Sequence, residues 1–212
     1  MKIAIFGASG ATGQLLTSRC LDAGHDVAAL VRKPDNFRFA NRVRLVTGSV
    51  FDPGCVRETL AGSDAVLSAL GARSLRKEDV LERAVPIIVQ AMRESGVRRI
   101  VVLGGASAHP ESLRLQPALV RWFLLHVVYR GVLKWPSVAQ RSQWETLSTS
   151  DLDWSMVMPP MLTNSPAGGS YRVDTAALPP RGARISRADL ADFTVRQLTD
   201  SRYLRKGVYI AW

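Results

Sequence analysis

Three glycines near the start of the chain constrain the fold more than any other feature. They follow a short apolar run at residues 3–6 and are spaced G-x-x-G-x-x-G, at Gly7, Gly10 and Gly13. The next segment, residues 14–21, carries leucines suited to one packed face of a helix. A buried strand, a glycine turn and a helix together form the local structure of a dinucleotide-binding loop.

Each glycine has a separate expected role in such a loop. Gly7 allows a sharp turn, Gly10 leaves room for a pyrophosphate at the backbone, and Gly13 allows the helix to lie close to the sheet. The helix N-terminus then offers free N–H groups to the phosphates. A purely structural turn is the alternative, but a turn needs fewer glycines. The cofactor contacts expected in this loop are Gly7, Ser9, Gly10, Ala11, Thr12 and Gly13.

The residue that ends the second predicted strand indicates which nucleotide is bound. Residues 27–31 form an apolar run, and Arg32 follows directly. In dinucleotide folds an acidic residue here binds the ribose 2′-hydroxyl of NAD, whereas a basic residue accommodates a 2′-phosphate. The first carboxylate, Asp35, comes only after Pro34. We therefore predict NADP(H), with Arg32 as the main contact; the alternative is a solvated loop charge.

Strand and helix patterns alternate along most of the chain. Strands are expected at 43–46, 65–70, 99–103, 153–158 and 208–210, and helices at 53–60, 79–94, 138–147 and after Ser186. This order predicts an α/β fold: a Rossmann-type doubly wound parallel sheet with helices on both faces and a small C-terminal substrate lobe. Residues 1–212 would form a single NAD(P)-binding domain, with 108–136 and 159–184 as insertions near the substrate cleft. Leu70, Gly71 and Ala72, at a strand end, would face the cofactor or simply form a strand-to-loop turn.

Composition limits the classes of partner. The net charge of +10 is compatible with nucleic acid, an anionic membrane surface or an anionic small ligand. The arginines are scattered and no nucleic-acid motif occurs, so we expect a small-molecule substrate and no specific nucleic acid. Cys20 and Cys55 lack metal or redox spacing. Because the sequence also lacks a signal-peptide pattern, we expect reduced thiols in a cytoplasmic protein. We further expect a monomer or homodimer, and no bound metal.

Residues 108–136 interrupt the alternation. The segment 119–133 is rich in large apolar residues, and a period of 100° per residue divides it into two faces. It could pack on the body or on a partner subunit, or lie on a membrane as a basic amphipathic helix. The first face would hold Trp122, Leu124, Leu125, Val128 and Tyr129, and the second His126, Arg130 and Lys134.

The chain as a whole resembles the short-chain dehydrogenase/reductase superfamily, in the atypical NAD(P)H-binding branch of NmrA-like and biliverdin reductase B/flavin reductase proteins. The resemblance implies that Thr12 and Arg32 lie near the 2′-phosphate. It also implies that Glu145 matches a glutamate bordering the active cleft. The motifs that carry it are Ile5–Gly13, Leu30–Arg32, Asp64–Gly71, Gly96–Val97, Leu152–Trp154, Met158–Pro160 and Ile185–Leu190.

The departures from that family concern the catalytic acid. Reductases of the superfamily commonly use a Tyr-x-x-x-Lys pair, but Tyr129 is followed four residues later by Leu133. In the biliverdin reductase B type, Pro-Pro-His follows the sixth strand. This chain resembles that motif at Pro159 and Pro160 but has Met161 in place of the histidine. Glycines occupy 104–105, where a serine or threonine often follows the fifth strand, and Ser107 comes slightly later. Ser107 is the catalytic candidate, as a polar contact to nicotinamide or substrate.

The end of the predicted strand 153–158 is where nicotinamide and substrate should meet. Pro159 is expected against the cofactor, and Met161 and Leu162 form an apolar wall suited to a flat ring, although methionine is also a generic gap-filler. We predict an NADPH-dependent reductase that passes hydride to a flavin, quinone or related conjugated carbonyl compound. The alternatives are a non-catalytic NADP(H)-sensing regulator, or an isomerase or dehydratase on the same fold.

Overall fold

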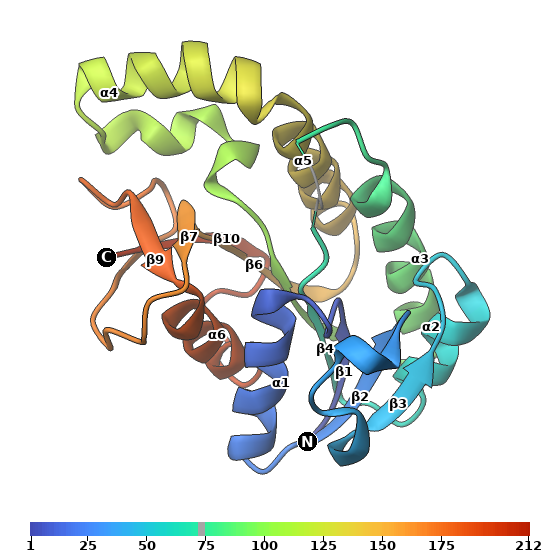
Figure 1. Cartoon of the computed structure of the whole chain (residues 1–212). Helices are drawn as coiled ribbons and strands as arrows, with labels where there is room; N and C mark the ends of the chain where they lie inside the picture. The colour runs from blue at the N-terminus through green and yellow to red at the C-terminus, as the bar shows by residue number, and fades with distance from the viewer. Residues whose placement is uncertain (72–74) are drawn as a thin grey trace.

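A computed structural model describes residues 1–71 and 75–212. Its centre is an eight-stranded sheet with the order β3-β2-β1-β4-β5-β6-β10-β8 (Figure 1). The strand pairs are parallel except for the edge pair β10–β8, which is antiparallel. The strands are β1 (Lys2–Phe6), β2 (Asp26–Val31), β3 (Arg44–Thr47), β4 (Ala65–Ser68), β5 (Arg99–Leu103), β6 (Asp153–Met158), β8 (Arg172–Asp174) and β10 (Lys206–Ala211).

Helices cover both faces of this sheet. One face packs against α2, α3 and α5, and the other against α1 and α6, as Figure 1 shows on its two sides. The predicted doubly wound α/β fold is therefore confirmed. The helices are α1 (Ala11–Asp22), α2 (Pro53–Leu60), α3 (Val80–Glu94), α4 (Ala118–Phe123), α5 (Lys134–Ser148) and α6 (Arg187–Arg196), with short 3-10 turns η1 (Pro34–Asn36), η2 (Ala40–Arg42), η3 (Ala106–Ala108) and η4 (Pro110–Leu115).

The apolar run at the start of the chain explains why the sheet is buried on both sides. Successive side chains of a strand point to opposite faces. Ala4 and Phe6 of β1 enter the core beneath α2 and α3, whereas Ile3 and Ile5 enter the core beneath α1 and α6. A strand with apolar residues at every position therefore suits the middle of a two-sided sheet.

Local capping signals fix two of the helix starts. The Asp52 carboxylate accepts the Gly54 N–H at 2.8 Å, and Pro53 occupies the first turn of α2. The Ser186 hydroxyl accepts the Asp189 N–H at 2.9 Å at the start of α6, as the capping-box pattern predicts. Pro86 lies inside α3 without ending it.

Two segments differ from the sequence-based expectation. Residues 124–132 form η5 (Leu124–Val132), a π-helix that continues α4, in which the Leu133 N–H donates to the Val128 carbonyl at 2.8 Å. The predicted face is wrong for Trp122, which lies in α4 before the π-helix and whose side chain is exposed. Leu124, Leu125 and Tyr129 of that face do pack against the core. Strand β4 also ends at Ser68 rather than at Leu70.

The region 159–184, expected as an insertion near the substrate cleft, contains short strands. β7 (Met161–Thr163) pairs in parallel with β9 (Arg184–Ser186), and β8 joins the main sheet through β10. Among the helices of the described residues, none combines the length and apolar character that crossing a membrane requires.

Asp189 connects this lobe to the rest of the fold. Its buried carboxylate accepts hydrogen bonds from the backbone N–H groups of Gly168 and Gly169, both at 2.9 Å, from the Trp212 indole N–H at 2.9 Å and from the Ser186 hydroxyl at 2.8 Å. Burial raises the pKa of the Asp189 carboxyl, but the hydrogen bonds outweigh burial and hold the pKa below its usual value. One carboxylate thus joins α6, the lobe and the C-terminal residue.

We expect Asp189→Asn to lower the free energy of unfolding at neutral pH by about 2 kcal/mol, because it removes charge-assisted hydrogen bonds. The folded-state pKa is depressed, so the wild-type advantage is complete above the unfolded pKa of about 4 and disappears as the pH falls through the folded value. Urea unfolding at neutral and acidic pH measures this difference. Asp192→Asn, which removes only an ion pair to Arg196, is the control. An equal loss in both variants would contradict the assignment.

Candidate functional site

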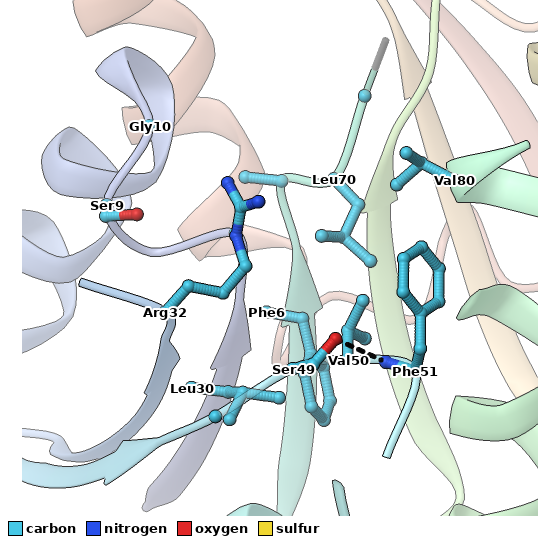
Figure 2. Close-up of a pocket in the computed structure, with 14 residues that line it drawn as sticks. Phe6, Ser9, Gly10, Leu30, Arg32, Ser49, Val50, Phe51, Leu70 and Val80 are labelled. Carbon is cyan, nitrogen blue, oxygen red and sulfur yellow. Dashed lines mark hydrogen bonds between the residues drawn. The ribbon is translucent and has the colours of Figure 1, made fainter. Parts of the chain in front are cut away.

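A pocket of about 330 Å³ opens at the carboxyl ends of strands β1 to β4. Five separate segments of the chain supply its walls, and Figure 2 shows side chains from each of them around the pocket. Ligand clefts of open α/β sheets lie at this edge, where the strand order reverses on either side of β1. The lining residues are Phe6, Gly7, Ser9, Gly10, Leu30, Arg32, Gly48, Ser49, Val50, Phe51, Ala69, Leu70, Gly71 and Val80.

Two of the three loop glycines are required by packing. Gly7 has a φ of +79°, and a Cβ on it would lie 2.7 Å from the carbonyl carbon and oxygen of Ala69. A Cβ on Gly13 would lie 2.1 Å from the Gly7 carbonyl oxygen. Neither position has room for a side chain, so the loop lies directly between β4 and the first turn of α1.

Gly10 has a different role from its two neighbours. Its backbone is extended, with φ −72° and ψ 165°, and a Cβ would meet only the Gly7 carbonyl oxygen, at 3.4 Å. As the N-cap of α1 it offers no side-chain acceptor, and the first intrahelical bond runs from the Gln14 N–H to the Gly10 carbonyl at 2.9 Å. The N–H groups of residues 11–13 precede that bond and suit an anion at the pocket rim.

Arg32 supplies a positive charge at the same place. Figure 2 shows its side chain directed into the space between Ser9 and Leu70. The described lining residues include no aspartate or glutamate. None of the ion pairs found in residues 1–71 and 75–212 involves Arg32. The guanidinium is therefore available to a negatively charged ligand.

The pocket wall opposite Ser9 and Gly10 is apolar. Val50, Phe51, Leu70 and Val80 gather there (Figure 2). The Ser49 hydroxyl accepts the Phe51 N–H at 3.2 Å, and the Arg83 guanidinium lies 4.3 Å from the centre of the Phe51 ring. These contacts orient an aromatic wall against which a flat heterocycle can lie.

The comparisons with known proteins agree with this geometry. The profile of the NAD(P)H-binding family matches residues 7–201, which is most of the chain. The chain belongs to the NAD(P)H-binding family. Its pocket has the parts such a protein needs for a nucleotide cofactor: free helix N–H groups, a cation and an apolar wall.

Solved structures of other proteins share the fold over the whole chain. A protein from Burkholderia pseudomallei has a TM-score of 0.80 and 28% identity, covering 100% of both chains. A short-chain dehydrogenase/reductase from Veillonella parvula, solved in complex with NADP, has a TM-score of 0.81 and 19% identity, covering 100% of this chain and 94% of that one. ChuY, an anaerobillin reductase from Escherichia coli O157:H7, has a TM-score of 0.80 and 17% identity, covering 99% and 97%.

Several curated relatives match only about half of this chain. An uncharacterized protein of Mycobacterium tuberculosis is 31% identical over 102 residues, which are 48% of this chain. The chain spans 12% of the length of that relative. Partial matches of this kind carry no activity over to this chain.

The described cofactor residues predicted from the sequence lie in three places. Six of them line the pocket together: Gly7, Ser9, Gly10, Arg32, Leu70 and Gly71. Ala11, Thr12 and Gly13 form the first turn of α1 beside it, and Ala72 lies outside the described residues. Pro159 lies away from the pocket, at the end of β6, where its carbonyl accepts the Ala106 N–H at 3.0 Å.

The predicted substrate residues are not brought together with the pocket. Ser107 is half-buried in η3, one residue after the contact to Pro159. Met161 is 63% exposed and lines a second cavity with Arg181, Ala183, Arg184 and Trp212. Leu162 packs at the edge of the core beneath α1 and α6, and Glu145 is exposed on α5.

Sequence reasoning missed the apolar pocket wall. Val50 and Phe51 follow the Gly48-Ser49 pair at the end of β3, and Val80 begins α3. The rule that places ligands at the carboxyl ends of parallel strands would have selected Val50 and Phe51. Val80 carries no such signal, because its place in the pocket depends on how α3 packs.

The His109 side chain packs against Trp144 of α5. Its ring meets Trp144 edge-on at 4.6 Å, and its Nδ1 lies 3.3 Å from a Glu111 carboxylate oxygen. Burial lowers the pKa of the His109 imidazole, although Glu111 opposes this shift. The described residues contain no group of three or more His, Cys, Asp or Glu side chains placed to hold a metal ion.

The two loop glycines provide a matched test of the cofactor pocket. We expect Gly10→Ala to fold normally but to weaken NADPH binding at least about tenfold, because the new methyl group occupies the phosphate approach. We expect Gly7→Ala to lower the free energy of unfolding by about 1–3 kcal/mol, because an alanine there is strained and meets Ala69. Calorimetric titration and urea unfolding of both variants measure the two effects. Unchanged NADPH affinity in Gly10→Ala would contradict the phosphate position.

Proposed function

We propose that this chain is an NADPH-dependent reductase that transfers hydride to a flat conjugated acceptor, such as a flavin, a quinone or a related carbonyl compound. Membership of the NAD(P)H-binding family supports the cofactor class. The observation that carries the proposal is the pocket at the glycine loop, where Arg32 stands without a carboxylate neighbour. The fold shared with ChuY, an anaerobillin reductase, is consistent with a reductase.

The choice of NADPH over NADH rests on charge at the end of β2. A 2′-phosphate adds negative charge at the adenosine ribose, and a guanidinium binds phosphate through two parallel hydrogen bonds. Arg32 occupies the position where NAD-binding proteins carry an acidic residue. The neighbouring Ser9 and the first turn of α1, which includes Thr12, would complete the phosphate contacts.

The choice of acceptor rests on the absence of a Tyr-x-x-x-Lys pair from the sequence. Burial raises the pKa of the Tyr129 phenol to about 12, so that it is a poorer acid than an ordinary tyrosine. No lysine stands four residues after it to lower that value. A flavin or quinone needs little proton donation from the protein at the moment of hydride transfer, so orientation by the protein is sufficient.

When bound, NADPH supplies the hydride, and the residues at the ends of β5 and β6 would orient the acceptor. The contact between Ala106 and Pro159 holds these two strand ends together. We assign Ser107 a polar contact to the nicotinamide or substrate. Pro159 would lie against the nicotinamide, and Met161, Leu162 and Glu145 would border the acceptor.

Cofactor preference tests the role of Arg32. We expect Arg32→Ala to weaken NADPH binding by about 10- to 100-fold, since a charge-assisted hydrogen bond is lost, and to leave NADH binding nearly unchanged. Lys33→Ala is the matched control, because Lys33 is the next cation along the chain and does not line the pocket. Calorimetric titration with both nucleotides provides the measurement. Equal affinities for NADH and NADPH in the wild type, unchanged in Arg32→Ala, would contradict the assignment.

Turnover tests the activity itself. We expect the purified protein to oxidise NADPH in the presence of FMN, riboflavin, a quinone or biliverdin. The absorbance of the reduced nicotinamide measures this reaction. NADH in parallel should support a slower reaction. Tight NADPH binding without oxidation by any acceptor would contradict the reductase and favour an NADP(H)-sensing regulator. A product of unchanged mass would favour an isomerase.

A further inference from the structure

The outer side of α4 and η5 carries an exposed apolar surface. Neither helix contains a buried residue. Of the large hydrophobic side chains exposed in the described residues, nine lie between positions 115 and 138. We call this set the apolar ridge: Leu115, Leu119, Val120, Trp122, Phe123, Val127, Val132, Trp135 and Val138.

Most of the ridge lies on α4 and η5, with Leu115 just before them in η4 and Trp135 and Val138 just after them in α5. This part of the chain is anchored to the body of the protein. Leu124, Leu125 and Tyr129 pack against the core on the α5 side of the sheet. Figure 1 shows α4 and the coil that continues it running along the outer edge of the molecule before α5 begins. Since the inner side is satisfied by the core, the exposed outer side needs another explanation. Leu119 is 79% exposed and Trp122 is 56% exposed, so packing against the core does not account for these large apolar side chains.

Charge around the ridge has one sign. No aspartate or glutamate occurs between Glu111 and Glu145. The exposed cations of this stretch are Arg114, Arg121, Arg130, Lys134 and Arg141. An apolar strip whose own stretch of chain carries arginine and lysine but no carboxylate is complementary to a surface that is anionic outside and apolar beneath.

We propose that the apolar ridge docks this protein on the surface of an anionic lipid bilayer. Leucine, valine and phenylalanine side chains would enter the boundary of the acyl chains, and Trp122 and Trp135 would lie at the headgroup level. Arg121, Arg130 and Lys134 would contact lipid phosphates. The helix would lie in the interface plane, which agrees with its lack of the length needed to cross a membrane.

A second copy of the chain fits this surface less well. A twofold dimer places the same patch on both subunits, so that the cations of both copies gather at one contact. The stretch has no acidic residue to neutralise them. Like charges brought together in a contact that excludes water are costly, whereas lipid phosphates neutralise them.

Vesicle flotation tests the proposal without reference to enzyme activity. We expect the wild-type protein to float with vesicles that contain phosphatidylglycerol and to remain unbound with phosphatidylcholine alone, and we expect high salt to weaken the binding. Arg121→Glu/Arg130→Glu should reduce the bound fraction at least about tenfold. Arg19→Glu/Arg57→Glu, a change of the same net charge on α1 and α2, should reduce it far less.

The apolar part is tested by Trp122→Ser/Phe123→Ser, with Leu75→Ser as the control, because Leu75 is 56% exposed outside the ridge. We expect the double variant to lose vesicle binding while its unfolding midpoint and NADPH affinity stay unchanged. Equal binding of the wild type to neutral and anionic vesicles would overturn the proposal, as would equal losses in the two charge variants. A wild-type dimer that Trp122→Ser/Phe123→Ser converts to a monomer would overturn it in favour of self-association.

Discussion

The structure depends on the close approach between the first helix, the first turn and strand β4. Gly13 lies so near the Gly7 carbonyl, and Gly7 so near the carbonyl of Ala69, that a methyl group at either position would collide with backbone. This contact fixes the direction of α1, and with it the unpaired N–H groups of its first turn. The proposed nucleotide site would therefore be a consequence of backbone packing, because its phosphate contacts would come from main-chain atoms at the glycine loop.

Side chains add the features that backbone geometry lacks. The loop after β1 does not by itself distinguish NAD from NADP, whereas Arg32 and the absence of carboxylates in the described lining would favour the extra 2′-phosphate of NADP. The apolar wall of Val50, Phe51 and Leu70 would hold a flat ring, with Arg83 positioning the Phe51 ring. The Asp189 carboxylate joins the lobe to α6 through its hydrogen bonds.

Local signals made much of the fold predictable. Helix 53–60 and strand 99–103 have their predicted bounds, because Asp52-Pro53 and an apolar run ending in glycine are signals contained in a few residues. The π-helix at 124–132 was missed, since its turn differs from the 100° per residue on which face assignment depends. Strand β8 and Val80 were also missed. Each is placed by contacts with segments far away in the sequence, which periodicity cannot report.

The most direct measurement is a calorimetric titration with adenosine 2′,5′-bisphosphate and with AMP, which represent the half of the cofactor that the pocket would hold. The account predicts one site per chain and an affinity for the bisphosphate at least about tenfold higher, because only that ligand carries the 2′-phosphate for Arg32. Equal affinities would contradict NADP(H) recognition. Failure of both ligands to bind would contradict the pocket as the nucleotide site.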